Sequence, residues 1–485
     1  MAETFDSEKF EKAARAIYEK RGFSPQLLSE PAMVGVIEET ARVLGTAIDS
    51  ALPHEVPDTL RYALEENAFI FSGLKTFHSL REVGLSLTDD KGNIKPFVDF
   101  WKDVERINDT YNKNYLRAEY QQAVGASIMA AKWVEYTEDG DRYDLQYRTA
   151  GDERVRASHA SLDGITLPPS DPFWSSYFAP NGWGCRCDVV QVRAGKYERT
   201  DSEAALKLGE ECTATPKLAM FRFNPGQTMQ LFPPKHPYNK APKGIVERVV
   251  KFVTQKRMDK IAEELPDNLT EEEKRAVAQN CIDIEKALKI KKGKTKSVEQ
   301  ADKQNANPHL NKGGGFTTNC QTCSPAYMLR LRGFNLTAKK KTKGSKLEYL
   351  SLGRSFEVWK NVDGTPAKHI SQKEWMEERG YKKMTPRRYK EFFDEACREV
   401  GVYQLSIAWK SGGGHATILQ RFENGELRYI EPQRDNSEGS GREHLKIDYL
   451  AGKGGSAIHA CRGIMRIDNK IFDISFLDIF ERSKK

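Results

Sequence analysis

The sequence predicts a multidomain α+β protein with a mostly helical N-terminal region, a small α/β segment, a helical linker and a C-terminal α+β domain. The chain has 485 residues, which corresponds to about three ordinary domains of roughly 150 residues each. Residues 1–110 and 244–288 carry apolar side chains at helical spacing. In the last third, helices are followed by alternating strands, an order typical of α+β domains.

Composition excludes several classes of protein. Hydrophobic residues make up 39% of the chain and aromatic residues 10%, which is enough for packed cores and excludes wholesale disorder. No apolar run reaches the roughly 18–20 residues that a membrane span needs, and the charged N-terminus does not read as a secretion signal. Eight cysteines are too few for a disulfide scaffold in a chain of this length. We therefore expect a soluble protein made in the cytosol, with no membrane partner.

The charge pattern gives little support to a dedicated nucleic-acid binder. The net charge of +7 is mild, because 76 basic residues are set against 69 acidic ones. Lysines gather in two runs, at 289–296 and 339–346. Such runs usually lie in solvent, which is the interpretation that we prefer. Contact with a phosphate backbone is the alternative.

The predicted helices of the N-terminal region each have one apolar face. From Met33 onward, apolar residues recur every three or four positions, which indicates one buried stripe. These residues are Ile37, Ala41, Leu44, Ile48 and Leu52. A second run is rich in aromatic side chains, which is typical of a core or a subunit interface. It contains Phe69, Phe71, Leu74, Phe77 and Leu80.

The middle of the chain changes character twice. Residues 143–149 alternate polar and apolar side chains and predict a strand, whereas prolines exclude a continuous helix from 158–190. A helical pattern returns at 244–288. It gives way to a stretch rich in lysine, asparagine and glycine at 289–315, which we interpret as a linker and as the main domain boundary.

The last third predicts two helices and three strands. The segment 324–333 ends in glycine, and 385–401 begins with Thr385 as N-cap followed by proline at the first helical position. The strands are expected at 403–409, 415–422 and 427–432, joined by turns that contain glycine.

Three side chains of this last third could carry out thiol chemistry. Cys320 starts a predicted helix, and the partial positive charge at a helix N-terminus lowers the pKa of a thiol. His415 starts a strand and could accept the thiol proton, while Glu431, at the end of the next strand, could orient the imidazole. Three glycines directly before His415 would permit close approach of a substrate.

The same segment resembles the papain-fold toxin domains proposed to be glutamine deamidases. The motifs are Asn319-Cys320, Arg332-Gly333, Gly414-His415-Ala416 and Glu431-Pro432-Gln433, within residues 307–468. The resemblance implies a papain-like fold, with Cys320 as nucleophile, His415 as general base and Glu431 as orienting acid. Glu431 departs from the aspartate that is usual in that family. Asn319 and Gln433 are the candidate substrate-binding residues, although Gln433 could instead be structural.

Metal or redox chemistry is the alternative for the pair Cys320 and Cys323. One C-x-x-C pair is half of a zinc site, and its second half is missing because Cys397 and Cys461 are isolated. A thioredoxin-like pair would follow a strand, whereas a glycine-rich segment precedes Cys320. We expect Cys323 to be packed in the core.

The stretch from Tyr111 to Val192 resembles the phage Mu F-like (MuF) family of minor head and head morphogenesis proteins. The matching residues are Arg156, His159, Leu162, Gly164, Trp174, Pro180, Asn181, Trp183, Cys185, Arg186 and Cys187. Members of that family are minor capsid components near the portal, and some carry toxin domains at the C-terminus. The resemblance therefore implies portal and capsid proteins as partners and a place in the virion, in the capsid interior or near the portal.

His159, Cys185 and Cys187 could also supply three ligands to zinc, with Asp163 or Asp171 as a fourth. The interpretation that we prefer is that His159 packs this loop together with Trp174 and Trp183, so no metal residue and no cofactor is assigned. For Arg156 and Arg186 we expect ion pairs with Asp152 or Asp163, although a portal-proximal protein could also contact phage DNA.

Together these predictions describe a phage minor capsid protein that carries an amidohydrolase effector, a polymorphic toxin encoded by a prophage. The expected domains are a helical region at 1–110, a MuF domain at 111–200, a helical and basic linker at 201–305 and a papain-fold toxin domain at 306–485. The effector would deamidate glutamine or cleave peptide bonds in an unknown target protein, with an immunity protein as a further partner. It would be present in the bacterial cytoplasm during assembly and after delivery. The alternative is a purely structural virion protein whose C-terminal domain is catalytically inert or binds metal.

Overall fold

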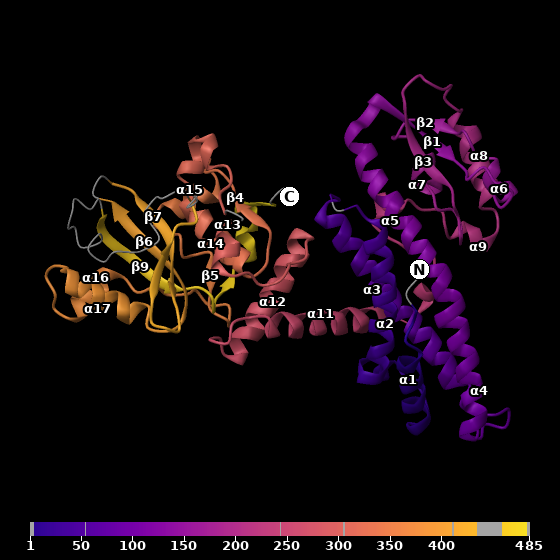
Figure 1. Cartoon of the computed structure of the whole chain (residues 1–485), viewed down its shortest axis with the longest axis horizontal. Helices are drawn as coiled ribbons and strands as arrows, with labels where there is room; N and C mark the ends of the chain where they lie inside the picture. Colours follow the sequence, from indigo (N-terminus) through magenta and orange to yellow (C-terminus); the bar gives the residue numbers. More distant parts are fainter. Residues whose placement is uncertain are drawn as a thin grey trace. The chain divides into compact units, whose positions relative to one another are not determined.

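A computed structural model describes residues 4–53, 55–242, 244–303, 306–409, 412–433 and 458–482. The chain divides into two compact units, Met1–Thr254 and Gln255–Lys485. Each unit has its own hydrophobic core. Figure 1 shows that each unit combines helices with small sheets. The predicted multidomain α+β class is therefore confirmed.

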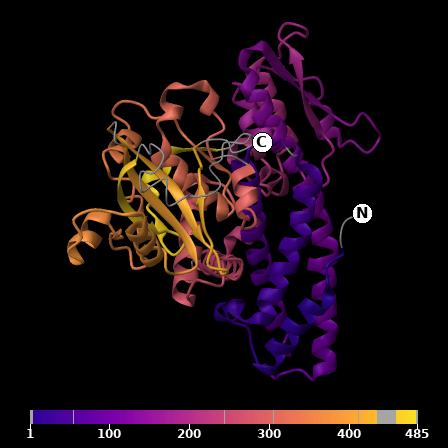
Figure 2. The same cartoon turned by 60° about the vertical axis from the view of Figure 1, so that its left-hand side comes forward.

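The first unit is built on long helices that pack side by side (Figure 2). Its helix α2 contacts α1, α3 and α5, and the predicted stripe of Ile37, Leu44 and Ile48 is buried against them. The aromatic run on α3 lies in the same core, which decides between the two sequence interpretations. The helices are α1 (Ser7–Glu19), α2 (Pro31–Ala51), α3 (Asp58–Leu85), α4 (Phe97–Asn108) and α5 (Leu116–Asp139), with a π-helical turn at Asp109–Tyr115 before α5.

A small antiparallel sheet follows α5, in the strand order β2-β1-β3. Its central strand β1 (Tyr143–Arg148) is the one predicted from alternation, and it pairs with β2 (Thr166–Leu167) and β3 (Asp188–Arg193). The helices of this part are α6 (Ala157–Ala160), α7 (Phe173–Tyr177), α8 (Ser202–Cys212), α9 (Pro216–Ala219), α10 (Pro225–Thr228) and α11 (Ile245–Glu263), of which α11 continues into the second unit. Short 3₁₀ turns lie at Pro25–Ser29, Gly140–Arg142 and Pro237–Lys240.

The second unit has a four-stranded antiparallel sheet at its centre, in the strand order β8-β7-β6-β9. Helix α14, which begins at Cys320, packs against β7. In Figures 1 and 2 the strands β6, β7 and β9 lie side by side. The strands are β4 (Leu336–Ala338), β5 (Trp359–Lys360), β6 (Gly401–Trp409), β7 (Gly414–Arg421), β8 (Leu427–Ile430), β9 (Ile458–Arg466), β10 (Ile471–Phe472) and β11 (Phe480–Arg482).

The helices of the second unit surround this sheet and two smaller strand pairs, β10-β5 and β11-β4. They are α12 (Glu271–Leu288), α13 (Val298–Lys303), α14 (Cys320–Leu331), α15 (Lys346–Ser351), α16 (Gln372–Glu378) and α17 (Pro386–Ala396), with 3₁₀ turns at Leu310–Lys312, Gly314–Thr317 and Ile474–Ile479. The predicted N-cap of α17 is confirmed, because Thr385 accepts a bond from the amide of Arg388. The helix ends at Ala396, whereas Gly401 already begins β6.

The division between the units comes earlier than the predicted linker. Helix α12 contributes Val277, Cys281 and Ile284 to the second core, and the segment after it contributes Ile290. Backbone bonds from Gly293 to Gly333 and from Lys296 to Leu331 hold this segment beside α14. The segment 289–315 therefore has the composition of a linker but is packed against the second unit at its start. Its residues 304 and 305 lie outside the described residues. The four predicted domain ranges stay a prediction.

The sequence predicts that no segment of the chain spans a membrane. In the part of the chain that the structure describes, no helix combines the length and the apolar character needed to cross a bilayer.

Candidate functional site

Cys320 is the first residue of α14 and is 4% exposed. The thiol therefore sits at a helix N-terminus, where unpaired backbone N–H groups favour negative charge. Cys323 lies one turn along the helix and is fully buried, with its Sγ 3.4 Å from Oδ1 of Asn319. Burial, followed by the nearby charges of Cys320 and Glu431, raises the pKa of the Cys323 thiol well above its usual range. Cys323 is thus packed as predicted, and Cys320 is the better placed of the two to be reactive.

His415 connects the thiol to a carboxylate. Its Nε2 lies 2.7 Å from Oε2 of Glu431, and its side chain also hydrogen-bonds the Cys320 thiol. Burial by itself lowers the pKa of His415, but the bonds with Cys320 and Glu431 outweigh burial and raise it to about 10. The imidazole is therefore protonated at neutral pH, in contact with both a sulfur and a carboxylate.

Glu431 is held as a carboxylate by three donors. Burial alone raises its pKa, but the bond from His415, followed by those from Tyr429 and the Gln433 amide, outweighs burial, so the pKa is lowered. The Tyr429 hydroxyl lies 2.8 Å from Oε2 and the Gln433 amide nitrogen 3.1 Å from Oε1. Glutamate thus reaches the histidine ring despite the departure from the usual aspartate.

The predicted glycine turn positions His415 at the start of β7. Gly412 and Gly413 have φ angles of 91° and 77°, in the left-handed region that favours glycine. A Cβ atom on Gly414 would lie 2.5 Å from the carbonyl oxygen of Ile407 on β6. The glycines therefore allow β7 to start close beside β6 and so fix where the histidine emerges.

The two candidate substrate-binding residues lie in a buried amide network. Nε2 of Gln433 lies 3.2 Å from Oδ1 of Asn319, and Nδ2 of Asn319 donates to Oδ1 of Asn307 and to the carbonyl of Lys339. Asn307 in turn donates to the carbonyl of Gln433 over 2.9 Å. The three amide side chains are at most 3% exposed. Their contacts tie the start of α14 to the end of β8.

A shallow depression opens beside the imidazole, with about 290 Å³ of empty volume. Small and polar side chains supply most of its wall, and Arg462 supplies a positive charge. It is lined by Gln321, Leu350, Ser351, Gly353, Ser355, Ser406, Ile407, Gly414, His415, Ala416 and Arg462. A substrate group in this depression would contact His415 and the residue that follows Cys320.

Sequence reasoning missed Tyr429, Asn307 and Arg462. Tyr429 carried a signal, since residues two apart on an extended strand point to the same face and Tyr429 lies two before Glu431. Asn307 and Arg462 carried no such signal, because each lies far along the chain from its contacts: Asn307 donates to Gln433 and Arg462 to the carbonyl of Gly413.

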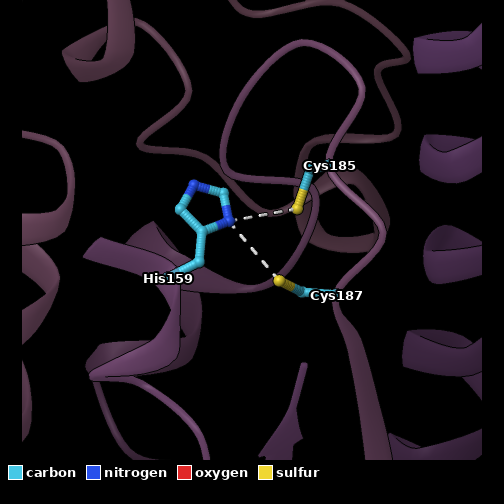
Figure 3. Close-up of side chains that lie close together, drawn as sticks. All are labelled: His159, Cys185 and Cys187. Carbon is cyan, nitrogen blue, oxygen red and sulfur yellow. Dashed lines mark hydrogen bonds between the residues drawn. The ribbon is translucent and has the colours of Figure 1, made fainter. Parts of the chain in front are cut away.

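A second cluster of reactive side chains lies in the first unit. Nδ1 of His159 lies 3.4 Å from Sγ of Cys187 and 3.6 Å from Sγ of Cys185, and the three atoms all lie within 4.8 Å of one another. Figure 3 shows both sulfurs facing the same ring nitrogen. Among the described residues, this is the one group of three that could hold a metal ion.

The ionisation of this cluster is strongly shifted. Hydrogen bonds with Cys187, followed by that with His159, lower the pKa of Cys185 to about 4 despite burial. Burial by itself lowers the pKa of His159, but its bonds with Cys185 and Cys212 outweigh burial and raise it to about 9. The bond with Cys185, together with burial, raises the pKa of Cys187. One thiolate and one imidazolium therefore coexist here at neutral pH.

The loop around the two cysteines is held from outside the cluster. Arg186, between them, forms a two-pronged ion pair with Asp152, as predicted, at 2.5 and 2.6 Å. Arg156 departs from the prediction, because it donates to the carbonyl of Trp183. The two candidate fourth ligands are engaged elsewhere: Asp163 accepts from the Thr149 amide, and Asp171 from the Phe173 amide.

The packing predicted for this loop is present beside the cluster. Trp174 is fully buried and donates from Nε1 to the carbonyl of Pro168 over 3.1 Å, and Trp183 packs edge-on against Phe221.

The lysine run at 289–296 does not lie wholly in solvent as predicted, since Lys292 is 7% exposed and pairs with Glu264 over 2.9 Å.

Comparison with known proteins identifies the middle of the first unit. Residues 95–190 match the family described as Phage Mu protein F like protein. The Mu-like prophage FluMu F protein of Haemophilus influenzae is 27% identical over 184 residues, 35% of this chain and 41% of that protein. The Putative capsid assembly protein F of Escherichia phage Mu is 34% identical over 68 residues, 14% of this chain and 16% of that protein.

The chain thus spans less than half the length of either relative. No solved structure matches it. The resemblance predicted for Tyr111 to Val192 is confirmed, with a match that begins earlier, at residue 95. The family match includes His159, Cys185 and Cys187 and ends at residue 190, so the toxin resemblance of the C-terminal third stays a prediction.

Proposed function

We propose that this chain is a phage head-assembly protein whose second unit carries a cysteine-dependent amidohydrolase. The first half of the proposal rests on the family match over residues 95–190 and on the relative named as a capsid assembly protein. The second half rests on one observation, the contact of His415 with both Cys320 and Glu431.

The head-assembly role predicts that the first unit binds phage portal or capsid proteins and places the chain in the virion. Head particles assembled with the full chain, and with a chain that lacks residues 1–254, would be purified and analysed by mass spectrometry. We expect the full chain in the particles and the deletion variant outside them. Equal incorporation of the two would contradict this role.

The amidohydrolase would use Cys320 as nucleophile and His415 as acid and base. The thiolate attacks the amide carbon, and the imidazolium gives its proton to the departing nitrogen, so that a thioester and ammonia or an amine form. A water molecule then gives a proton to the neutral imidazole while its oxygen attacks the thioester carbon. The carbon–sulfur bond breaks, the thiolate returns, and a carboxylic acid leaves. The net reaction adds one water to one amide.

The other residues would act by positioning. Glu431 orients the ring through Nε2, which leaves Nδ1 for the sulfur, and Tyr429 holds that carboxylate. The side-chain amides of Asn319 and Gln433 are buried and hydrogen-bond each other, and Asn319 also bonds Asn307. A positioning role therefore suits them better than direct contact with substrate.

A glutamine side chain of a target protein is the substrate that we propose. The depression beside His415 is shallow and open, which suits a side-chain amide presented on a protein surface. Cleavage of a backbone peptide by the same residues is the second reaction, because placement of the amide rather than the catalytic groups separates the two. A toxin of this kind would also require an immunity partner in the cell that makes it.

The test is expression of the full chain in bacterial cells as wild type, Cys320→Ala and Cys323→Ala. We expect growth inhibition by wild type and Cys323→Ala, and its loss in Cys320→Ala, because the Cys320 thiol hydrogen-bonds the histidine. Mass spectrometry of cell proteins would then separate deamidation, a small mass gain at glutamine, from cleavage into fragments. Equal loss of toxicity in both variants would contradict thiol catalysis at Cys320 and favour an inert structural appendage.

A further inference from the structure

We infer that His159, Cys185 and Cys187 bind a zinc ion in the first unit, with water as the fourth ligand. Two sulfurs and an imidazole nitrogen are a ligand set that favours zinc over hard cations such as magnesium or calcium. The three ligand atoms lie within 4.8 Å of one another, and the thiols are free rather than joined in a disulfide. This site is independent of the proposed amidohydrolase, which uses none of these residues.

The distances between ligand atoms agree with tetrahedral coordination. With zinc–sulfur bonds near 2.3 Å and zinc–nitrogen bonds near 2.0–2.1 Å, a tetrahedral angle separates nitrogen from sulfur by about 3.6 Å. The two nitrogen–sulfur distances are 3.4 and 3.6 Å. One ion would therefore fit between the three atoms with little movement of the side chains.

A single ring nitrogen faces both sulfurs, as Figure 3 shows. A ring N–H carries one proton and can point along the line to one acceptor, so it cannot make two well-aligned hydrogen bonds at once. A metal ion would satisfy all three atoms together. The arrangement around Nδ1 is thus better suited to a shared ion than to hydrogen bonding alone.

The fold directs the three ligands to one point. His159 is buried on α6, while Cys185 and Cys187 are half-buried in the loop that leads into β3. Gly184, with a φ of 66°, turns the chain just before Cys185. Because Arg186 pairs with Asp152 on the outside, the two cysteines that flank it can turn inward together.

A water molecule would take the fourth position. Asp163 and Asp171 are committed to backbone amides of Thr149 and Phe173, and Cys212, which bonds with His159, lies outside the group of atoms within 4.8 Å. The partial exposure of Cys185 and Cys187 gives an ion a path of entry and gives water access to the remaining position. The ion would join α6 to the loop before β3, residues that are 26 to 28 positions apart.

The experiment uses the full chain, kept reduced, stripped with a chelator and then given zinc or cobalt alone. Elemental analysis should find about one zinc ion per chain. Cobalt should give the intense absorption of thiolate-to-metal charge transfer, and removal of the metal should lower the melting temperature. Cys185→Ser, Cys187→Ser and His159→Gln should each lose most of the metal and the charge-transfer band.

Cys397→Ala is the control, because it removes a buried thiol of the second unit, outside the group. We expect it to keep the metal. Circular dichroism would show whether each variant is folded, and titration of the stripped wild-type chain with cobalt tests the site without any substitution. A reduced, folded wild-type chain that takes up no zinc and shows no charge-transfer band would overturn the inference, and so would equal metal loss in Cys397→Ala.

The two proposals fail separately. Loss of metal in Cys185→Ser with toxicity intact would leave the amidohydrolase standing. Loss of toxicity in Cys320→Ala with zinc intact would leave the zinc site standing.

Discussion

Each unit of this chain places a histidine against cysteine, His159 buried and His415 partly buried, and the two histidines differ in their third neighbour. His159 faces the sulfurs of Cys185 and Cys187 through one nitrogen, with no carboxylate among the three groups. His415 faces the Cys320 sulfur and, through Nε2, the carboxylate of Glu431.

That difference separates ion binding from proton transfer. Two thiols and an imidazole converging on one point offer two soft sulfur ligands and one nitrogen ligand to one ion. A thiol, an imidazole and a carboxylate in a row instead offer a proton path, because the carboxylate stabilises the imidazolium that forms when the thiol loses its proton. The same pair of residue types therefore supports different chemistry according to a third neighbour.

The largest expected effect comes from replacing each histidine in turn. We expect His415→Gln to lower the amidohydrolase rate by about 100- to 10,000-fold, the usual contribution of a general acid or base, with zinc content unchanged. We expect His159→Gln to do the reverse, with loss of zinc and retention of toxicity. Elemental analysis and growth assays of both full-length variants measure this, and a variant that loses both properties would break the comparison.

The next largest effect concerns which residues the second unit needs in order to fold. A fragment of residues 307–485 lacks α12, whose Val277, Cys281 and Ile284 are fully buried in the second core. Burial of one valine or isoleucine side chain stabilises by about 1.5–3 kcal/mol, so removal of α12 takes away much of the roughly 5–15 kcal/mol that holds a domain folded. We expect cooperative urea unfolding, followed by circular dichroism, for 255–485 and none for 307–485.

Comparison of the two fragments tests whether the second unit begins near residue 255 or near residue 307. If both fragments unfold with the same midpoint, the segment before residue 307 is a linker after all.

A smaller effect is expected from Glu431→Gln, through pH. The pKa of His415 is raised from 6.5 to about 10 by bonds with Cys320 and Glu431 against the effect of burial. Because that pKa is raised, the contribution of the imidazolium to the free energy of unfolding is complete below pH 6.5 and is lost as the pH rises toward 10. Removing the Glu431 charge lowers the pKa of His415, so this loss should begin at lower pH.

The measurement is the midpoint of urea unfolding of the full chain as a function of pH, for wild type and Glu431→Gln. We expect the midpoint of Glu431→Gln to fall at lower pH than that of wild type, because the pKa of its His415 is lower. An unchanged profile would mean that Glu431 does not act on the histidine.

The smallest effect is expected from Tyr429→Phe. The Tyr429 hydroxyl donates to the Glu431 oxygen that also receives the His415 bond. Its loss removes one hydrogen bond to a charged group, and a cost near 1.4 kcal/mol corresponds to about a tenfold fall in rate. The toxic dose of expressed protein would report it, and an effect on that dose larger than that of Glu431→Gln would give Tyr429 a role of its own.

Much of the secondary structure followed from local pattern. Spacing of apolar residues predicted α2 and α3, alternation predicted β1, and proline and threonine at the start of α17 predicted where it begins. Local pattern failed at the segment after α12, where lysines and glycines suggested a linker. Lys292 is buried there and pairs with Glu264, a contact that composition does not encode.

For the candidate sites too, some features followed from the sequence and others only from the tertiary structure. By itself the sequence determined which residues have the right chemistry and which local element holds each one: a thiol at a helix start, a histidine after a glycine turn, two cysteines flanking an arginine. Only the tertiary structure decided which cysteine meets which histidine, and whether a carboxylate or a second thiol completes each group. The reason is distance along the chain: Asn319 and Gln433, 114 residues apart, are joined by packing of α14 against the sheet.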